Sequence, residues 1–101
     1  MTAINVLIAE DQTLMRQGLR TILELSDGFA VVGEAENGQQ AVDRALALRP
    51  DVVLMDVQMP ELSGVEATAQ IAQALPETKV ILLTTFDHDA YIFDGMQAGA
   101  R

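Results

Sequence analysis

The chain has 101 residues, half of them hydrophobic, and its fifteen acidic and six basic side chains give a formal net charge of −9. This length suits one domain with a hydrophobic core, and the lack of cysteine excludes disulfides, thiolate metal sites and a thiol nucleophile. The chain lacks the basic patch that nucleic-acid binding needs, and with no membrane-length apolar run or signal pattern we expect a cytoplasmic location.

The first strand and helix are predicted within the first 25 residues. Residues 4–9 are mostly apolar and form a short strand that ends in Glu10 and Asp11. A helix is predicted over residues 13–25, because apolar side chains recur at helical spacing along one side. This apolar stripe consists of Met15, Leu19, Ile22 and Leu23.

A second strand and helix follow. Residues 29–35 form the strand, and Asn37-Gly38 turns the chain into a helix that ends at Arg49-Pro50-Asp51. The buried face expected for this helix consists of Ala41, Val42, Ala45, Leu46 and Leu48.

The stretch Val52–Pro60 is the most informative part of the chain, because four apolar residues run directly into Asp56. Such a continuous run indicates a strand buried on both faces of a helix-covered parallel sheet. Ligand-binding groups of open α/β sheets gather at the carboxyl ends of the strands, where Asp56 would lie. Pro60 keeps the residue before it extended, so the loop should be stiff. Taken alone, Asp56 could equally be a turn residue that caps the next segment.

Ser63 is predicted to cap a third helix, which Pro76 ends. The inner stripe of this helix is expected to be Val65, Thr68, Ala72 and Leu75. Residues 79–85 form a fourth strand that ends in two threonines, and Asp87 can cap a fourth helix reaching Arg101. Four strand–helix units with short connections predict an α/β domain with a parallel sheet and right-handed crossovers.

Polar groups end three of these strands: Glu10 with Asp11, then Asp56, then Thr84. Parallel strands end at the same edge of a sheet, so we expect these groups to meet. Clustered carboxylates repel and take up protons unless a cation is present, and Mg²⁺ prefers such oxygen ligands. An aspartate beside Mg²⁺ can attack a phosphoryl donor. The hydroxyl of Thr84 could contact a phosphoryl oxygen or, almost as readily, cap the next helix.

The sequence resembles the receiver domain of two-component response regulators, in particular the NarL/FixJ regulators that carry a LuxR-type DNA-binding domain. The matching stretches are Val6–Asp11, Val53–Pro60, Gly64 and Val80–Thr85. The resemblance implies a flavodoxin-like, doubly wound parallel sheet with strand order 2-1-3-4-5.

The resemblance also implies roles for individual residues. Asp56 would accept a phosphoryl group from a histidine kinase, which makes the chain a regulatory phosphoacceptor domain rather than an enzyme. Mg²⁺ would be held by Glu10, Asp11, Asp56 and the backbone carbonyl of Gln58, with Asp11 as a direct ligand and Glu10 acting through water. Thr84 would contact the phosphoryl group and act as the switch. The implied partners are the kinase and a second copy on activation, with DNA contacted only through an effector domain.

Receivers of this type continue into a fifth strand with a switch aromatic and an essential lysine, and then into a fifth helix. The present chain stops at Arg101, before those elements. Lys79 opens its strand and so belongs to the opposite edge of the sheet. We therefore expect residues 1–101 to be a truncated receiver domain, with a transcription-regulating effector domain absent.

Two other functions compete with a phosphorylation switch. A phosphohydrolase that uses a strand-end aspartate resembles the pattern hhhDxD, in which the second aspartate is the general acid, but here that position is Gln58. A pseudo-receiver would act only by binding proteins. The presence of the acidic pair, Asp56 and Thr84 disfavours it.

Overall fold

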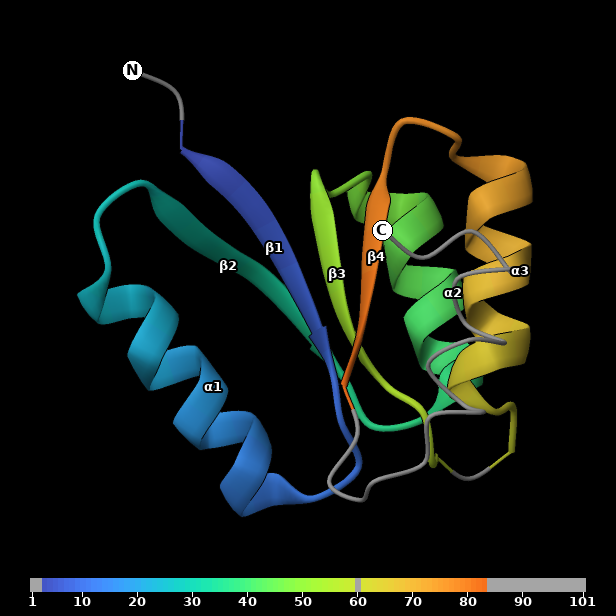
Figure 1. The fold of residues 1–101 in the computed structure, drawn as a ribbon, viewed down its shortest axis with the longest axis horizontal. Helices are drawn as coiled ribbons and strands as arrows, with labels where there is room; N and C mark the ends of the chain where they lie inside the picture. Colours follow the sequence, from blue (N-terminus) through green and yellow to red (C-terminus); the bar gives the residue numbers. More distant parts are fainter. Residues whose placement is uncertain (1–2, 60, 84–101) are drawn as a thin grey trace.

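The structure is a computed structural model, and it describes residues 3–59 and 61–83 (Figure 1). Its elements in chain order are β1 (Ile4–Ala9), α1 (Thr13–Leu25), β2 (Phe29–Ala35), α2 (Gly38–Leu48), β3 (Val52–Asp56), α3 (Gly64–Ala74) and β4 (Lys79–Leu83). The strands form one parallel sheet in the order β2-β1-β3-β4. The predicted order is therefore confirmed for these strands. Thr84 and the helix predicted from Asp87 lie outside the described residues.

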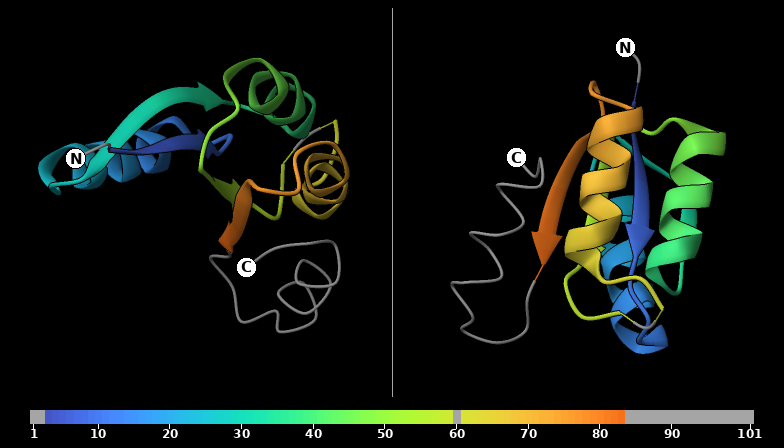
Figure 2. Two further views of the ribbon diagram at one scale, coloured as in Figure 1. Left: turned by 90° about the horizontal axis from the view of Figure 1, so that it is seen from above. Right: turned by 90° about the vertical axis from the view of Figure 1, so that its right-hand side faces the viewer.

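Helices lie on both faces of the sheet, with α1 on one face and α2 and α3 on the other (Figures 1 and 2). The main core fills the space between the sheet and the α2–α3 pair. It includes Leu7 of β1, Val53 and Met55 of β3, Ile71 of α3 and Val80 of β4, all of them fully buried. In the described part of the chain, no helix is long and apolar enough to cross a membrane.

The opposite face of the sheet is covered less completely, because its helix, α1, packs mainly on β1 and β2. Ile8, Leu54 and Ile81 lie side by side across β1, β3 and β4. Ile8 is fully buried, Leu54 is half-buried and Ile81 is 39% exposed. The prediction that the central strand is buried on both faces is therefore only partly correct: Val53 and Met55 are buried, whereas Leu54 is not.

The predicted buried stripes of the first two helices need correction. In α1, Met15 and Ile22 are exposed, and only Leu19 and Leu23 are half-buried. In α2 the small residues face the sheet as expected, but Leu46 and Leu48 are exposed. Periodicity alone thus places these apolar residues in the core, although the neighbouring elements leave them exposed.

The stripe predicted for α3 is rotated from the observed one. Thr68 and Leu75 are buried as expected, but Val65 and Ala72 are only half-buried, while Ala67 and Ile71 lie in the core. Thr68 is tolerated there because its hydroxyl donates a hydrogen bond of 2.7 Å to the Gly64 carbonyl, one turn earlier.

Side chains cap the start of two helices. The side chain of Asn37 accepts a hydrogen bond from the Gln40 amide at 2.8 Å, and Ser63 accepts one from the Glu66 amide at 3.2 Å. Each satisfies a backbone donor that has no partner within the helix. The predicted Ser63 cap is confirmed. Gln12, at the N-cap position of α1, makes no such side-chain bond.

Asp51, just before β3, joins the amino-terminal ends of three strands. Its amide donates to the Asn5 carbonyl of β1 at 2.9 Å, and its carboxylate accepts from the Asn5 amide at 2.8 Å. Its own carbonyl accepts from the Lys79 amide of β4 at 3.0 Å. We call this arrangement the Asp51 clasp. It places Lys79 at the opposite edge of the sheet from Asp56, as predicted.

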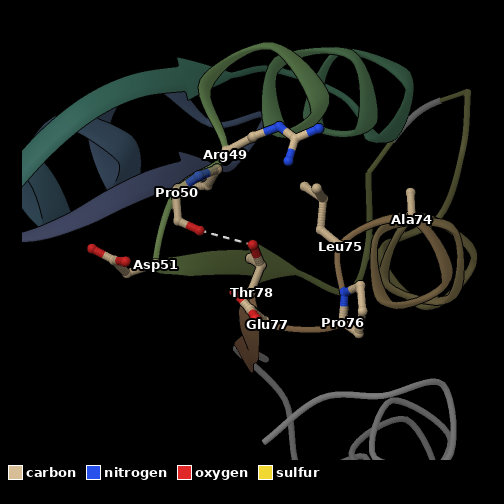
Figure 3. A pocket seen from close by; sticks show the side chains of 8 residues that line it. All are labelled: Arg49, Pro50, Asp51, Ala74, Leu75, Pro76, Glu77 and Thr78. Carbon is tan, nitrogen blue, oxygen red and sulfur yellow. Dashed lines mark hydrogen bonds between the residues drawn. The ribbon is translucent and has the colours of Figure 1, made fainter.

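A cleft of about 390 Å³ lies beside the Asp51 clasp, between the start of β3 and the end of α3 (Figure 3). Across it, the Thr78 hydroxyl donates a hydrogen bond of 2.8 Å to the Pro50 carbonyl. Arg49, Asp51 and Glu77 supply its charged groups. The cleft is therefore at the end of the sheet where none of the predicted site residues lies.

Candidate functional site

The carboxyl ends of β1 and β3 bring the predicted acidic residues together. Ala9 pairs with Met55 in the sheet, so the residues that follow each of them leave neighbouring strands side by side. Carboxylate oxygens of Glu10, Asp11 and Asp56 all lie within 4.8 Å of one another. We call these residues the acidic cluster. The prediction that acidic groups at the carboxyl ends of different parallel strands meet in space is confirmed for these residues.

Glu10 is the most tightly held member of the acidic cluster and is 3% exposed. Its amide donates to the Ala35 carbonyl of β2 at 2.9 Å, and its own carbonyl accepts from Arg16 Nη1 at 2.7 Å. Its side-chain Oε2 accepts from the Gln12 amide at 3.1 Å. The backbone and the carboxylate of Glu10 are thus fixed at the same time.

Asp56 is half-buried at the end of β3, and Asp11 is exposed. The Oδ1 atom of Asp56 accepts a hydrogen bond from the Gln58 amide at 3.3 Å, within the loop that follows the strand. One carboxylate of the cluster is therefore buried and fixed, one is partly accessible and one is open to solvent. Asp11 and Asp56 are the members that an incoming ligand can reach most readily.

Burial and mutual repulsion change the protonation of the acidic cluster. Desolvation, together with interactions with Asp56 and Asp11, raises the pKa of Glu10 to about 7, against the opposing effect of the Gln12 amide. Desolvation also raises the pKa of Asp56, and its hydrogen bonds with Glu10 and the Gln58 amide limit that rise. Without a cation, burial and repulsion therefore favour protonation within the cluster.

The loop between β3 and α3 is shaped by a glycine. The Gly64 amide donates to the Val57 carbonyl at 2.9 Å, so the first residue of α3 lies directly against the end of β3. A Cβ atom added at Gly64 would be 2.1 Å from the Asp56 carbonyl oxygen and 2.8 Å from Val57 Cα. Only a glycine allows this approach, which fixes the position of the backbone that carries Asp56.

Sequence reasoning missed Arg16, which is only 8% exposed. It lies in the second turn of α1, and its guanidinium contacts the Glu10 carbonyl and the Glu34 carboxylate. Its position one helical turn before Leu19 and Arg20 places it on the inward side of α1. A charged residue within that stripe was the available signal. Thr84, by contrast, lies outside the described residues, and the structure does not test the predicted role of the Gln58 carbonyl.

The sequence matches the response regulator receiver domain family over residues 6–101. The chain belongs to this family. This receiver domain is 47% identical over 97 residues to the uncharacterized transcriptional regulatory protein YxjL of Bacillus subtilis, and 41% identical over 97 residues to the response regulator GacA of Pseudomonas viridiflava. Each match covers 96% of this chain but only 44% and 45% of the respective relative. The chain thus spans less than half the length of these relatives.

Solved receiver structures share the fold. The signal receiver domain of NarL from Mycobacterium tuberculosis has a TM-score of 0.93 at 35% identity, covering 99% of this chain and 81% of that one. CheY of Borrelia burgdorferi, in a complex with CheX, BeF₃ and Mg²⁺, has a TM-score of 0.89 at 25% identity, covering 99% of this chain and 75% of that one. The predicted receiver fold, with transcriptional regulators among its relatives, is therefore confirmed.

Proposed function

We propose that this receiver domain is a phosphorylation-dependent signalling switch in which Asp56 accepts the phosphoryl group. The observation that carries the proposal is the position of Asp56 at the carboxyl end of β3, with oxygens of Glu10 and Asp11 within 4.8 Å. Its partial accessibility suits a group that must meet a partner, whereas buried Glu10 suits a supporting role. The Borrelia CheY complex, which contains BeF₃ and Mg²⁺ on the same fold, supports this choice.

The acidic cluster fits Mg²⁺ by the chemistry of its donors. All three side chains offer carboxylate oxygens, and burial, with a smaller contribution from neighbouring carboxylates, raises the pKa of both Glu10 and Asp56. We assign Asp11 and Asp56 as direct ligands, Glu10 as a ligand through water and the Gln58 carbonyl as a further ligand. When bound, Mg²⁺ would neutralise the charge that develops on the phosphoryl oxygens.

In the transfer step, one carboxylate oxygen of Asp56 attacks the phosphorus of a phosphohistidine or a small phosphodonor. An O–P bond forms, the bond from phosphorus to the donor breaks, and the donor atom takes its electron pair. The Gln58 amide donates a hydrogen bond to Oδ1 of Asp56 and so orients the Asp56 carboxylate. Glu10 is held in place by its hydrogen bonds to the backbone of Gln12 and Ala35. Thr84 is proposed to bond the transferred group and report its arrival.

Response regulators receive their signals from histidine kinases, and we propose such a kinase as the donor here. The relatives, a transcriptional regulatory protein and a response regulator, are more than twice as long as this chain. We therefore propose that the phosphorylated receiver domain controls DNA binding by an effector domain and forms a homodimer on activation. The receiver domain itself, at a net charge of −9, does not contact DNA in this scheme.

Labelling of the complete receiver, including its fifth strand and lysine, by a small phosphodonor such as acetyl phosphate tests the proposal. The Asp56→Asn variant should lose essentially all label, while Asp43→Asn, at an exposed position of α2, should be labelled like the unsubstituted protein. Substantial label on Asp56→Asn would refute the assignment. No label on a receiver that includes the fifth strand and its lysine, with either a kinase or acetyl phosphate, would favour a pseudo-receiver. Asp11→Ala should weaken Mg²⁺ binding more than Glu10→Ala if Asp11 is the direct ligand.

A further inference from the structure

We propose that Arg16 is a positioning residue for the Mg²⁺ site, an inference that rests on the proposed function. Arg16 does not belong to the acidic cluster, yet its Nη1 atom donates a hydrogen bond of 2.7 Å to the Glu10 carbonyl. That carbonyl belongs to the peptide joining Glu10 to Asp11. The orientation of this peptide sets the directions in which the side chains of Glu10 and Asp11 leave the backbone. Arg16 therefore acts on these two ligands through their backbone.

The guanidinium joins the two parts of the chain that meet behind this peptide. Its Nε atom donates to Glu34 Oε1 of β2 at 3.0 Å, while Nη2 makes longer contacts of 3.5 Å with Thr13 Oγ1 and Glu36 Oε1. The planar guanidinium allows these contacts at once because its donors point in fixed directions. One buried side chain thereby couples the loop between β1 and α1 to the end of β2.

Glu34 is itself held from the other side. Its second oxygen, Oε2, accepts from Arg20, which also bonds Glu24 one turn later in α1. Arg16 and Arg20 therefore share one carboxylate, but in the described part of the chain Arg16 also bonds the Glu10 carbonyl at the start of the β1–α1 loop, whereas Arg20 bonds Glu24. This makes Arg20 a matched control, because it has the same charge, the same helix and the same partner.

The positive charge of Arg16 allows a positioning effect on Mg²⁺ binding to be distinguished from a purely electrostatic one. A positive group near a cation site opposes Mg²⁺ by Coulomb's law, so removing it should strengthen binding if charge were its main effect. If Arg16 instead fixes the Glu10–Asp11 peptide, removing it should weaken binding. Partners that orient metal ligands from behind change metal affinity by about 10- to 100-fold when they are removed. The two effects thus have opposite signs.

The experiment is a calorimetric Mg²⁺ titration of the Arg16→Gln and Arg20→Gln variants, combined with acetyl-phosphate labelling at increasing Mg²⁺. We expect Arg16→Gln to bind Mg²⁺ about tenfold more weakly, at the lower end of that range because it acts through the backbone. Saturating Mg²⁺ should restore its labelling rate. Arg20→Gln should bind Mg²⁺ as the unsubstituted protein does or slightly more tightly.

Thermal unfolding without Mg²⁺ shows whether each variant is folded. If Arg16→Gln is unfolded, the comparison passes to Arg16→Lys and Arg20→Lys, which keep the charge but lose the guanidinium geometry; only Arg16→Lys should weaken Mg²⁺ binding. Equal Mg²⁺ affinities for the Arg16 and Arg20 variants, or tighter binding by Arg16→Gln, would overturn the inference. Other results would refute the proposed function itself: an unsubstituted protein that does not bind Mg²⁺, or phosphoryl label that persists in the Asp56→Asn variant.

Discussion

At the scale of single residues, Glu10 links the protonation of the site to the stability of the fold. Its pKa rises from an ordinary value of 4.5 to about 7 in the folded protein, mainly because it is desolvated. The folded state therefore holds this proton more tightly than the unfolded state does. The resulting stabilisation is fully present below about pH 4.5 and is lost as the pH rises towards 7. The raised pKa of Asp56 acts in the same direction.

Bound as proposed, Mg²⁺ should reverse this pH dependence, because it would bind the ionised carboxylates and displace the proton. We expect Mg²⁺ to bind more tightly, and to raise the unfolding temperature more, at about pH 8 than at about pH 6. Calorimetry at both pH values measures this difference. Glu10→Gln should weaken the pH dependence of the metal-free protein. A Mg²⁺ affinity that is the same at both pH values would contradict the expectation.

At the scale of elements, the contact between the end of β3 and the start of α3 depends on Gly64. A methyl group at this position would overlap the Asp56 carbonyl, so Gly64→Ala must displace one of the two elements. We expect a loss of about 1–3 kcal/mol in the free energy of unfolding, together with slower labelling of Asp56. Denaturant unfolding and acetyl-phosphate labelling of the same variant measure the two effects.

Gly18→Ala is the matched control for that substitution. Gly18 lies in the middle of α1, and a Cβ atom there would meet nothing within 4 Å. Alanine is favoured over glycine by up to about 1 kcal/mol within a helix, so this variant should be more stable than the unsubstituted protein. If Gly64→Ala behaved like Gly18→Ala, the close approach at Asp56 would not constrain the site.

The elements themselves could be predicted from sequence, but not all of their buried faces. Apolar runs and helix signals such as Ser63 are local, and they predict every described helix and strand. Leu46 and Leu48 were assigned to the core because apolar spacing cannot tell which neighbour covers a helix. Arg16 was missed for the converse reason: a buried charge is stable only beside partners such as Glu34, which lies 18 residues away in the chain.

The acidic cluster, too, could be predicted from the sequence only in part. Glu10, Asp11 and Asp56 could be brought together in advance, because parallel strands share an edge and each residue ends an apolar run. Their differences in burial could not be predicted. Glu10 is covered and Asp11 exposed although they are adjacent in sequence, since the hydrogen bonds to Ala35 and Arg16 come from other elements.

At the scale of the whole molecule, the two ends of the sheet differ in what holds the strands together. At one end, the Asp51 clasp ties β1, β3 and β4 through three hydrogen bonds. At the other end, β1 and β3 finish in carboxylates that repel when they are ionised. The metal-free sheet is thus fastened at the end far from the chemistry and strained at the end where the chemistry would occur.

Local opening should therefore begin at the acidic end. Without Mg²⁺ above pH 7, we expect the amides of Glu10 and Val57 to exchange with deuterium faster than those of Asp51 and Lys79. Adding Mg²⁺ should slow the first pair and leave the second nearly unchanged, as amide-resolved exchange would show. Uniform slowing of all four amides would contradict this picture. Occupancy of the acidic cluster would then be visible as a gradient of protection along β1 and β3, before any phosphoryl group arrives.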